Sequence, residues 1–309
     1  MNASTERVAV VVVTYNRADL LPAMLDGLAA QTRPVDAVFV IDNASEDHTR
    51  EVLAARDDLP LRVTHGTENL GGAGGFHEGV RQAYAAGFDR IWLMDDDVVP
   101  APDCLATLLA LDGSCLMAVR EDSSGTLVEK SAVRFDLRNP LAIRPKTASI
   151  DSTYASRAEM PPTVPIENVA FEGFLVHRRV IDAIGLPDPA YFIFYDDVDF
   201  ALRARRAGFP ILAVRDAVLV RQLDFDQQHA LDTWKGFYMY RNLFVVHLRY
   251  AENPLVRLKP WLITLAVVLL SPLRGGRAEA ANVIKAMSAA RRLRSAPPLP
   301  EAEDRDTAR

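Results

Sequence analysis

Three consecutive carboxylates, Asp95, Asp96 and Asp97, follow an apolar run at residues 91–94. If that run is a strand, successive side chains point to opposite faces, so Asp95 and Asp97 share one face and Asp96 points to the other. Two carboxylates on one side repel each other unless a cation lies between them, and Mg²⁺ and Mn²⁺ take such oxygen ligands. The spacing therefore predicts a metal site, with an acidic turn before a helix at residues 102–111 as the structural alternative.

A second acidic group, Asp196, Asp197 and Asp199, stands at the start of a predicted helix. One of the three could cap that helix, and Asp199 with Arg203 makes an ordinary ion pair four residues apart. At least one carboxylate then has no structural task, and it stands beside the aromatic run at residues 191–195. Such a residue is a candidate general base.

Glycines cluster at residues 71–75, before a helix expected at residues 76–86. The amides of such a segment can face an anion, and the missing side chains allow a ligand to approach closely. His77 stands where G-x-G-x-x-G requires its last glycine, and no Gly-Lys-Ser/Thr follows. A dinucleotide dehydrogenase and a P-loop ATPase are therefore both disfavoured, and a flexible glycine turn is the structural alternative.

Hydrophobic patterning predicts the scaffold that positions these groups. Continuous apolar runs are typical of strands buried on both faces, and they alternate here with amphipathic segments of helical period. Strands are expected at residues 8–13, 37–41, 61–64 and 91–94, and helices at 20–28, 46–55 (with Ser45 as N-cap) and 76–86. This alternation predicts a doubly wound α/β sheet, whose ligands bind at the carboxyl ends of the strands. Asp42 lies at such an end, where it could make a turn or hydrogen-bond a nucleobase or ribose.

The pattern weakens between residues 112 and 167. Further short strands are expected at residues 116–119, 131–136, 168–177, 209–214 and 217–220, with a mobile loop at 149–165. We expect a catalytic domain over residues 1–230, a helical and membrane-proximal segment over 231–295, and a disordered tail over 296–309.

Composition narrows the function classes. The 309 residues carry a net charge of −6, which argues against general nucleic-acid binding. Two cysteines suggest no disulfide framework, and the first residues lack the features of a signal peptide, so a cytoplasmic protein is expected. Oligomerisation with a second copy of the chain stays open.

An apolar run at residues 261–270 is too short to span a bilayer. Arg257 and Lys259 precede it, and Arg274 and Arg277 follow it. An apolar segment flanked by basic residues is typical of a helix lying on an anionic membrane. The alternative is a helix that packs on the catalytic domain.

Five segments in this order carry a resemblance to a known family: VVVTYNR at 11–17, IDNAS at 41–45, NLGGAGGF at 69–76, DDD at 95–97 and FYDDVD at 194–199. The chain resembles the family-2 inverting glycosyltransferases with the GT-A fold over about residues 7 to 245. The glycine-rich segment is most similar to bacterial galactofuranosyltransferases that build cell-wall galactan on a polyprenyl diphosphate carrier. Rhamnosyltransferases of the same family are near neighbours.

The resemblance implies a role for each motif. Asp95 and Asp97 would hold Mn²⁺ or Mg²⁺, and Asp197 would take the proton from the acceptor hydroxyl in a single inverting displacement. Asp196 and Phe174 would lie on the acceptor side, with Phe174 stacking on a sugar. The nucleotide-sugar would contact Thr14, Tyr15, Arg17, Asp42, Asn69, Gly72 and Asp96.

One departure from the family pattern concerns the metal. Relatives usually carry a histidine after the last strand as a third metal ligand, where this chain has Arg221. A guanidinium cannot ligate a metal, although it could contact the diphosphate. A galactofuranosyltransferase acting on a lipid-linked acceptor is therefore the main expectation. The alternatives are a rhamnosyltransferase that uses dTDP-rhamnose and a catalytically impaired domain that only binds nucleotide-sugar.

Overall fold

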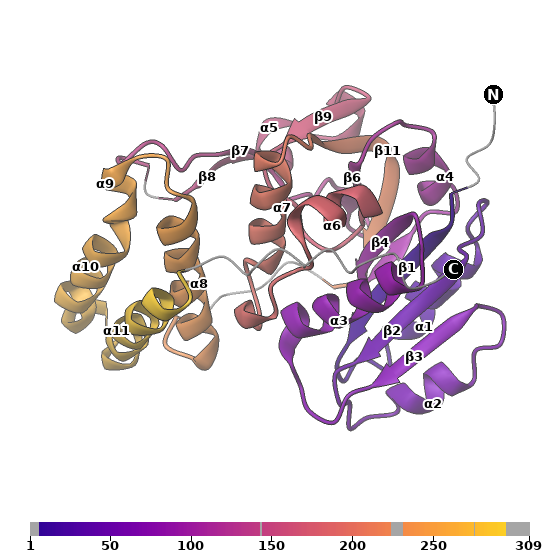
Figure 1. The fold of residues 1–309 in the computed structure, drawn as a ribbon, viewed down its shortest axis with the longest axis horizontal. Coiled ribbons are helices and arrows are strands. Elements are labelled where there is room, and N and C mark those ends of the chain that lie inside the picture. The colour runs from indigo at the N-terminus through magenta and orange to yellow at the C-terminus, as the bar shows by residue number, and fades with distance from the viewer. Residues whose placement is uncertain (1–5, 143, 224–230, 275, 295–309) are drawn as a thin grey trace, which may run out of the picture.

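The computed structural model describes residues 6–142, 144–223, 231–274 and 276–294. A mixed sheet with helices against it forms one half of the molecule, and a helical extension forms the other (Figure 1). This arrangement confirms the predicted α/β sheet with a C-terminal helical extension. The expected disordered tail at 296–309 lies outside the described residues.

Within the described residues the main sheet has nine strands, in the order β3–β2–β1–β4–β10–β6–β11–β5, with β9 beside β11. The first four strands of the chain are parallel, β10 is antiparallel to both β4 and β6, and β11 is parallel to β6. The strands are β1 (Val8–Thr14), β2 (Ala37–Asp42), β3 (Leu61–His65), β4 (Arg90–Asp95), β5 (Val98–Pro100), β6 (Cys115–Glu121), β9 (Thr163–Ile166), β10 (Phe174–His177) and β11 (Ile211–Arg221).

Strand β1 explains why the sheet is covered on both faces. All its residues are buried. Val8, Val10 and Val12 pack into one hydrophobic core, with α1 (Leu21–Ala29) and α4 (Cys104–Leu109). Ala9 and Val11 pack into the opposite core, with α3 (Gly71–Ala85), α6 (Arg178–Ile184) and α7 (Asp196–Arg206). The alternation of a strand thus distributes one apolar run between two layers.

The glycine cluster belongs to helix α3 itself, so the helix begins at Gly71 and the expected start at residue 76 is wrong. A Cβ at Gly75 would lie 2.5 Å from a methyl of Val13, and one at Gly79 would lie 2.3 Å from Val11. These glycines therefore let the helix pack closely on β1. Gly71 has a φ of +72° and meets the backbone of Phe192, a position that only glycine fills without strain.

Three other expectations in this half are wrong. Helix α2 (Thr49–Ala54) begins later than expected, and the Ser45 hydroxyl accepts a hydrogen bond from the Asn16 amide instead of capping it. The expected mobile loop at 149–165 contains α5 (Ile150–Thr153), a 3₁₀ turn at Arg157–Glu159 and strand β9. The expected strands at 209–214 and 217–220 are one strand, β11, with an irregularity between Val214 and Val218.

A second, two-stranded sheet is formed by β7 (Ala132–Phe135) and β8 (Lys146–Ser149). The helical extension comprises α8 (Trp234–Tyr250), α9 (Pro254–Arg257), α10 (Lys259–Arg274) and α11 (Arg277–Arg292). Phe244 of α8 packs with Val283 and Ala286 of α11 in a core of their own. None of the helices in the described ranges is both long and apolar enough to cross a bilayer.

Asp199 joins the helical extension to the sheet half. Its side chain is fully buried on α7 and accepts hydrogen bonds from Tyr191, Tyr250 and Arg249, at 2.9, 2.6 and 3.0 Å. It also pairs with Arg203 at 2.8 Å, as the spacing predicts. Because Tyr250 and Arg249 belong to α8, one carboxylate ties α7 to the extension.

Candidate active site

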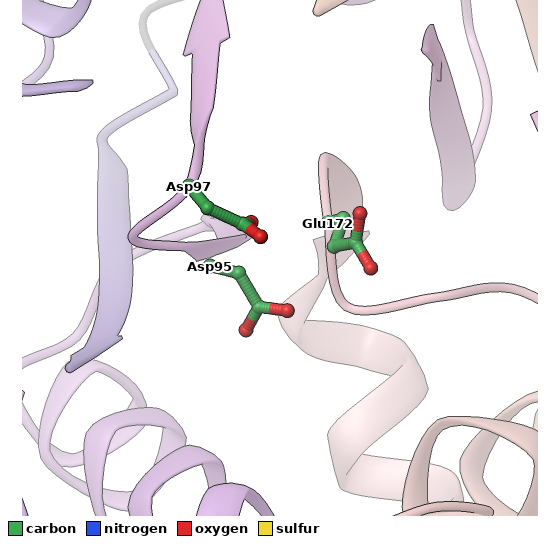
Figure 2. Close-up of side chains that lie close together, drawn as sticks. All are labelled: Asp95, Asp97 and Glu172. Carbon is green, nitrogen blue, oxygen red and sulfur yellow. The ribbon is translucent and has the colours of Figure 1, made fainter. Parts of the chain in front are cut away.

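Carboxylate oxygens of Asp95, Asp97 and Glu172 all lie within 4.8 Å of one another. Asp95 ends β4, Asp97 lies in the turn to β5, and Glu172 precedes β10 (Figure 2). Asp95 and Asp97 lie close together, as the sequence predicted, although Asp97 belongs to the turn and not to the strand. The sequence did not predict Glu172, which lies two residues before Phe174.

The electrostatics of this cluster favour a bound cation. Burial raises the pKa of Asp95 well above its usual range, and repulsion from Glu172 and Asp97 adds to that effect. Burial and Glu172 also raise the pKa of Asp97. Within the described residues, Oδ1 of Asp97 is buried and makes no hydrogen bond. Three hard oxygen ligands in a buried, mutually repelling group fit Mg²⁺ or Mn²⁺.

Two arginines contact the cluster. Arg221, at the end of β11, places Nη2 3.5 Å from Oδ2 of Asp97 and Nε 3.7 Å from Oε2 of Glu172. Arg120 is fully buried, binds Glu129 through two contacts of 2.8 Å each, and also pairs with Glu172. Arg221 therefore contacts the carboxylates of the cluster, a placement that the sequence did not predict.

Asp96 lies beside the end of β1 and does not belong to the cluster of Asp95, Asp97 and Glu172. Burial raises the pKa of Asp96 to about 6, while Thr14, Tyr15 and Arg17 lower it. Tyr15 and Arg17 are exposed in the loop after β1, and Thr14 is buried beneath them. The end of β1 thus brings together four of the residues that the sequence assigned to the nucleotide-sugar.

Asp42 is enclosed by its own loop. Its carboxylate accepts a hydrogen bond from the Ser45 amide at 2.8 Å and lies 2.9 Å from His65 Nδ1. Burial tends to raise the pKa of Asp42, but the contacts with Ser45 and His65 outweigh it and lower the pKa. The half-exposed His65 covers the carboxylate, so direct contact with a nucleoside requires His65 to move and stays a prediction.

The start of α3 offers an open surface at only one of its first glycines. A Cβ at Gly72 would meet nothing within 4 Å, whereas one at Gly74 would meet Leu70 at 2.5 Å. The exposed Asn69 accepts a hydrogen bond from the Gly71 amide at 2.8 Å and so shapes this start. Gly72 and Asn69 thus remain candidates for a donor contact.

Helix α7 presents Asp196 and Asp197 in its first turn. Burial raises the pKa of Asp197 to about 6, and its electrostatic neighbours include Lys146, Glu172 and Arg120. Asp196 is buried, and its pKa is raised well above the usual range by burial and by Asp197. A buried carboxylate with a raised pKa, whose charge interacts with Glu172 of the acidic cluster, is suited to accept a proton.

The loop before α7 has a strained backbone, and residues of the helical extension hold it in place by hydrogen bonds. Phe192, Phe194 and Tyr195 have φ values of 62°, 66° and 67°, which are unfavourable for residues with side chains. The fully buried Asn242 of α8 donates to the carbonyls of Tyr191, Ile193 and Phe194 at 3.0, 2.7 and 2.9 Å. Arg241 donates to the carbonyls of Ala190 and Tyr191 at 2.8 and 2.6 Å. The extension thus fixes the approach to Asp197.

The proposed sugar-stacking role of Phe174 is wrong. Its side chain has no exposed surface and packs against Phe171 and Phe200 in the core beneath the site. A ring enclosed on all sides cannot stack on a saccharide. The residue of this segment that reaches the site is Glu172.

Comparison with known proteins identifies the family. Residues 6–237 match the family model described as glycosyltransferase like family 2. The chain belongs to glycosyltransferase family 2. It is similar to galactofuranosyltransferase GlfT1 of Mycolicibacterium smegmatis, with 32% identity over 77% of this chain and 82% of that protein. GlfT1 of Mycobacterium tuberculosis is 34% identical over 77% of this chain and 81% of that protein.

Solved glycosyltransferase structures share the fold. The mannosyltransferase PcManGT of Pyrobaculum calidifontis, solved with GDP-Man and Mn²⁺, has a TM-score of 0.56 and 22% identity, covering 96% of this chain and 78% of its own. GalNAc-T7, solved with UDP, GalNAc and Mn²⁺, has a TM-score of 0.60 and 16% identity over 81% of this chain and 49% of its own. The GT-A fold is thus confirmed, and this family-2 protein is a glycosyltransferase.

Proposed function

We propose that this glycosyltransferase transfers galactofuranose from UDP-galactofuranose to a hydroxyl of a polyprenyl-diphosphate-linked saccharide, with inversion and with Mn²⁺ or Mg²⁺ bound. The observation that carries the proposal is the cluster of Asp95, Asp97 and Glu172, whose carboxylate oxygens lie close enough together to hold a cation. The charge of Glu172 acts on the buried carboxylate Asp197, which we propose as the proton acceptor. The choice of sugar is supported by the GlfT1 relatives, of which the chain spans 81% and 82%.

The donor would bind at the carboxyl ends of β1 and β4. Tyr15 and Arg17 are exposed there, and Gly72 leaves room for close approach of a ribose or diphosphate. Asp95, Asp97 and Glu172 would hold the metal, which when bound neutralises charge on the departing diphosphate. Arg221 lies at the same place and could contact the diphosphate directly.

The acceptor would approach from the side of α7. Asp197 would remove the proton from the acceptor hydroxyl as that oxygen attacks the anomeric carbon from the face opposite the diphosphate. The C–O bond to UDP breaks as the new glycosidic bond forms, so a single displacement inverts the anomeric configuration. Asn242 and Arg241 would hold the loop that orients Asp197.

The helical extension would place the enzyme on the inner face of the cell membrane. Exposed leucines follow one face of α10 at helical spacing, namely Leu262, Leu265, Leu269 and Leu273, and the exposed Leu258 directly precedes the helix. Arg257 and Arg277 are exposed at its two ends and suit anionic lipid headgroups. Lys259 does not contribute, because it is buried and donates to the carbonyls of Asn139 and Ala142.

Turnover of defined donors tests the proposed function. The purified protein is incubated with Mn²⁺, a synthetic polyprenyl-diphosphate-linked saccharide and either UDP-galactofuranose or dTDP-rhamnose. We expect transfer from UDP-galactofuranose, with an inverted linkage in the product. Transfer from dTDP-rhamnose alone would assign the rhamnosyltransferase alternative, and nucleotide-sugar binding without transfer from either would assign the impaired binding domain.

A further inference from the structure

A guanidinium lies on the carboxylates that form the metal site. Arg221 is buried and lies 3.5 Å from Asp97 and 3.7 Å from Glu172. Its backbone is fixed next to the same turn, since it pairs with Val98 of β5, and the amide of Gln222 donates to the carbonyl of Asp97 at 2.8 Å. The backbone pairing of the sheet therefore places Arg221 next to these carboxylates.

We infer that Arg221 and the divalent cation are alternative occupants of Asp97 and Glu172, so that the ion binds only when the guanidinium leaves both carboxylates. The inference rests on the proposed function, because the metal belongs to the donor site proposed above. Arg221 thereby acts as a built-in counter-cation that keeps the cluster together in the metal-free protein.

Geometry distinguishes Arg221 from the other arginine at the cluster. Arg120 is fixed by two contacts of 2.8 Å with the buried Glu129 and does not reach Asp97 among the interactions that the structure describes. Arg221 makes longer contacts, at 3.5 and 3.7 Å, so its ion pairs are the weaker ones. It is therefore the group that a metal ion displaces.

Arg221 and a metal ion exclude each other from the two carboxylates for reasons of charge and of ligand chemistry. A guanidinium has hydrogen-bond donors only and cannot join the coordination shell. A divalent ion requires carboxylate oxygens at about 2.0–2.2 Å, and a positive charge on the same two carboxylates opposes it. A nucleoside diphosphate would give the displaced guanidinium another anionic partner. Metal and diphosphate therefore favour each other's binding through Arg221.

Calorimetric titration of Mn²⁺ without nucleotide tests the competition. The proteins are the wild type, Arg221→Gln, Arg221→His, Arg221→Lys and the control Arg215→Gln. Arg215 lies on the same strand and pairs with Asp216 at the surface. We expect Arg221→Gln to bind Mn²⁺ about tenfold more tightly, because a repelling charge is removed. Arg221→His at pH 8 should bind more tightly still, because neutral imidazole ligates metals. Arg221→Lys and the control should stay near wild type.

A different order of Mn²⁺ affinities among the variants would overturn the inference. If neither Arg221→Gln nor Arg221→His binds Mn²⁺ more tightly than wild type, or if Arg221→Lys gains as much as the glutamine variant, competition by charge is excluded. If the glutamine variant shows no cooperative unfolding and is therefore misfolded, the Mn²⁺ affinities of the histidine and lysine variants still test the competition. Failure of the proposed function is seen separately, as absent sugar transfer by the wild type, while the order of Mn²⁺ affinities decides the role of Arg221.

Discussion

Replacing Asn242 by alanine should impair catalysis although the residue contacts no reactant. Its side-chain amide donates to three carbonyls in the loop before α7, those of Tyr191, Ile193 and Phe194. The same loop contains three residues with positive φ and leads directly into Asp196 and Asp197. Without these hydrogen bonds the loop should relax toward ordinary backbone angles and misplace the general base.

The size of the effect follows from the geometry. A hydrogen bond contributes about 1 kcal/mol net, and each buried carbonyl left without its donor costs about 1–3 kcal/mol. Asn242 is fully buried, so water does not replace its amide. Arg241 still donates to the Tyr191 carbonyl, which leaves those of Ile193 and Phe194 as the main losses. Two such carbonyls at about 1–3 kcal/mol each give an expected decrease of about 2–6 kcal/mol in the free energy of unfolding.

Urea unfolding and steady-state kinetics test this prediction together. At temperatures below the melting range of the variant, Asn242→Ala should lower kcat at least about tenfold, with little change in the affinity for UDP. The matched control is Asn282→Ala, which removes a half-buried asparagine that also donates to two carbonyls, those of Leu231 and Thr233. Loss of stability without loss of kcat, or equal kinetic effects of the two variants, would refute the reasoning.

Three further predictions concern the site and the extension. Asp197→Asn should lower turnover about 10²–10⁴-fold with unchanged UDP affinity. The kcat/KM of the wild type should fall as the pH decreases through about 6, because burial raises the pKa of Asp197 to about 6 and the base becomes protonated below it. A similar decline at acidic pH in the asparagine variant would contradict this role. Glu172→Gln should weaken Mn²⁺-dependent UDP binding at least about tenfold but spare metal-free binding, measured by calorimetry. Leu265→Asp with Leu269→Asp should abolish sedimentation with anionic vesicles yet keep turnover of a soluble acceptor; unchanged sedimentation would exclude α10 as the contact.

The sequence predicts the parallel half of the fold well because its signals are local. The continuous apolar run of β1 and the closeness of Asp95 and Asp97 depend only on neighbouring residues. Glu172 could not be found in this way, because it reaches the site through the antiparallel insertion of β10 between β4 and β6. That pairing joins segments far apart in the chain.

Residue type alone was also misleading in two places. The aromatic ring of Phe174 fills the core as well as it could stack on a sugar, and only its zero exposure distinguishes the two roles. The glycines at 71–75 have the composition of a loop, yet Gly75 serves the close packing of α3 against Val13. In both cases tertiary packing decided what local propensity left open.

Helix α10 lies in sequence between two helices that the rest of the molecule needs. Helix α8 is bound to Asp199 and to the loop before Asp197, and α11 completes the core around Phe244. The leucines of α10, by contrast, project outward and support neither core. The side chains on the outer face of residues 259–274 can therefore be replaced as a group. Protein engineering could in this way change the affinity for a surface without altering the catalytic site.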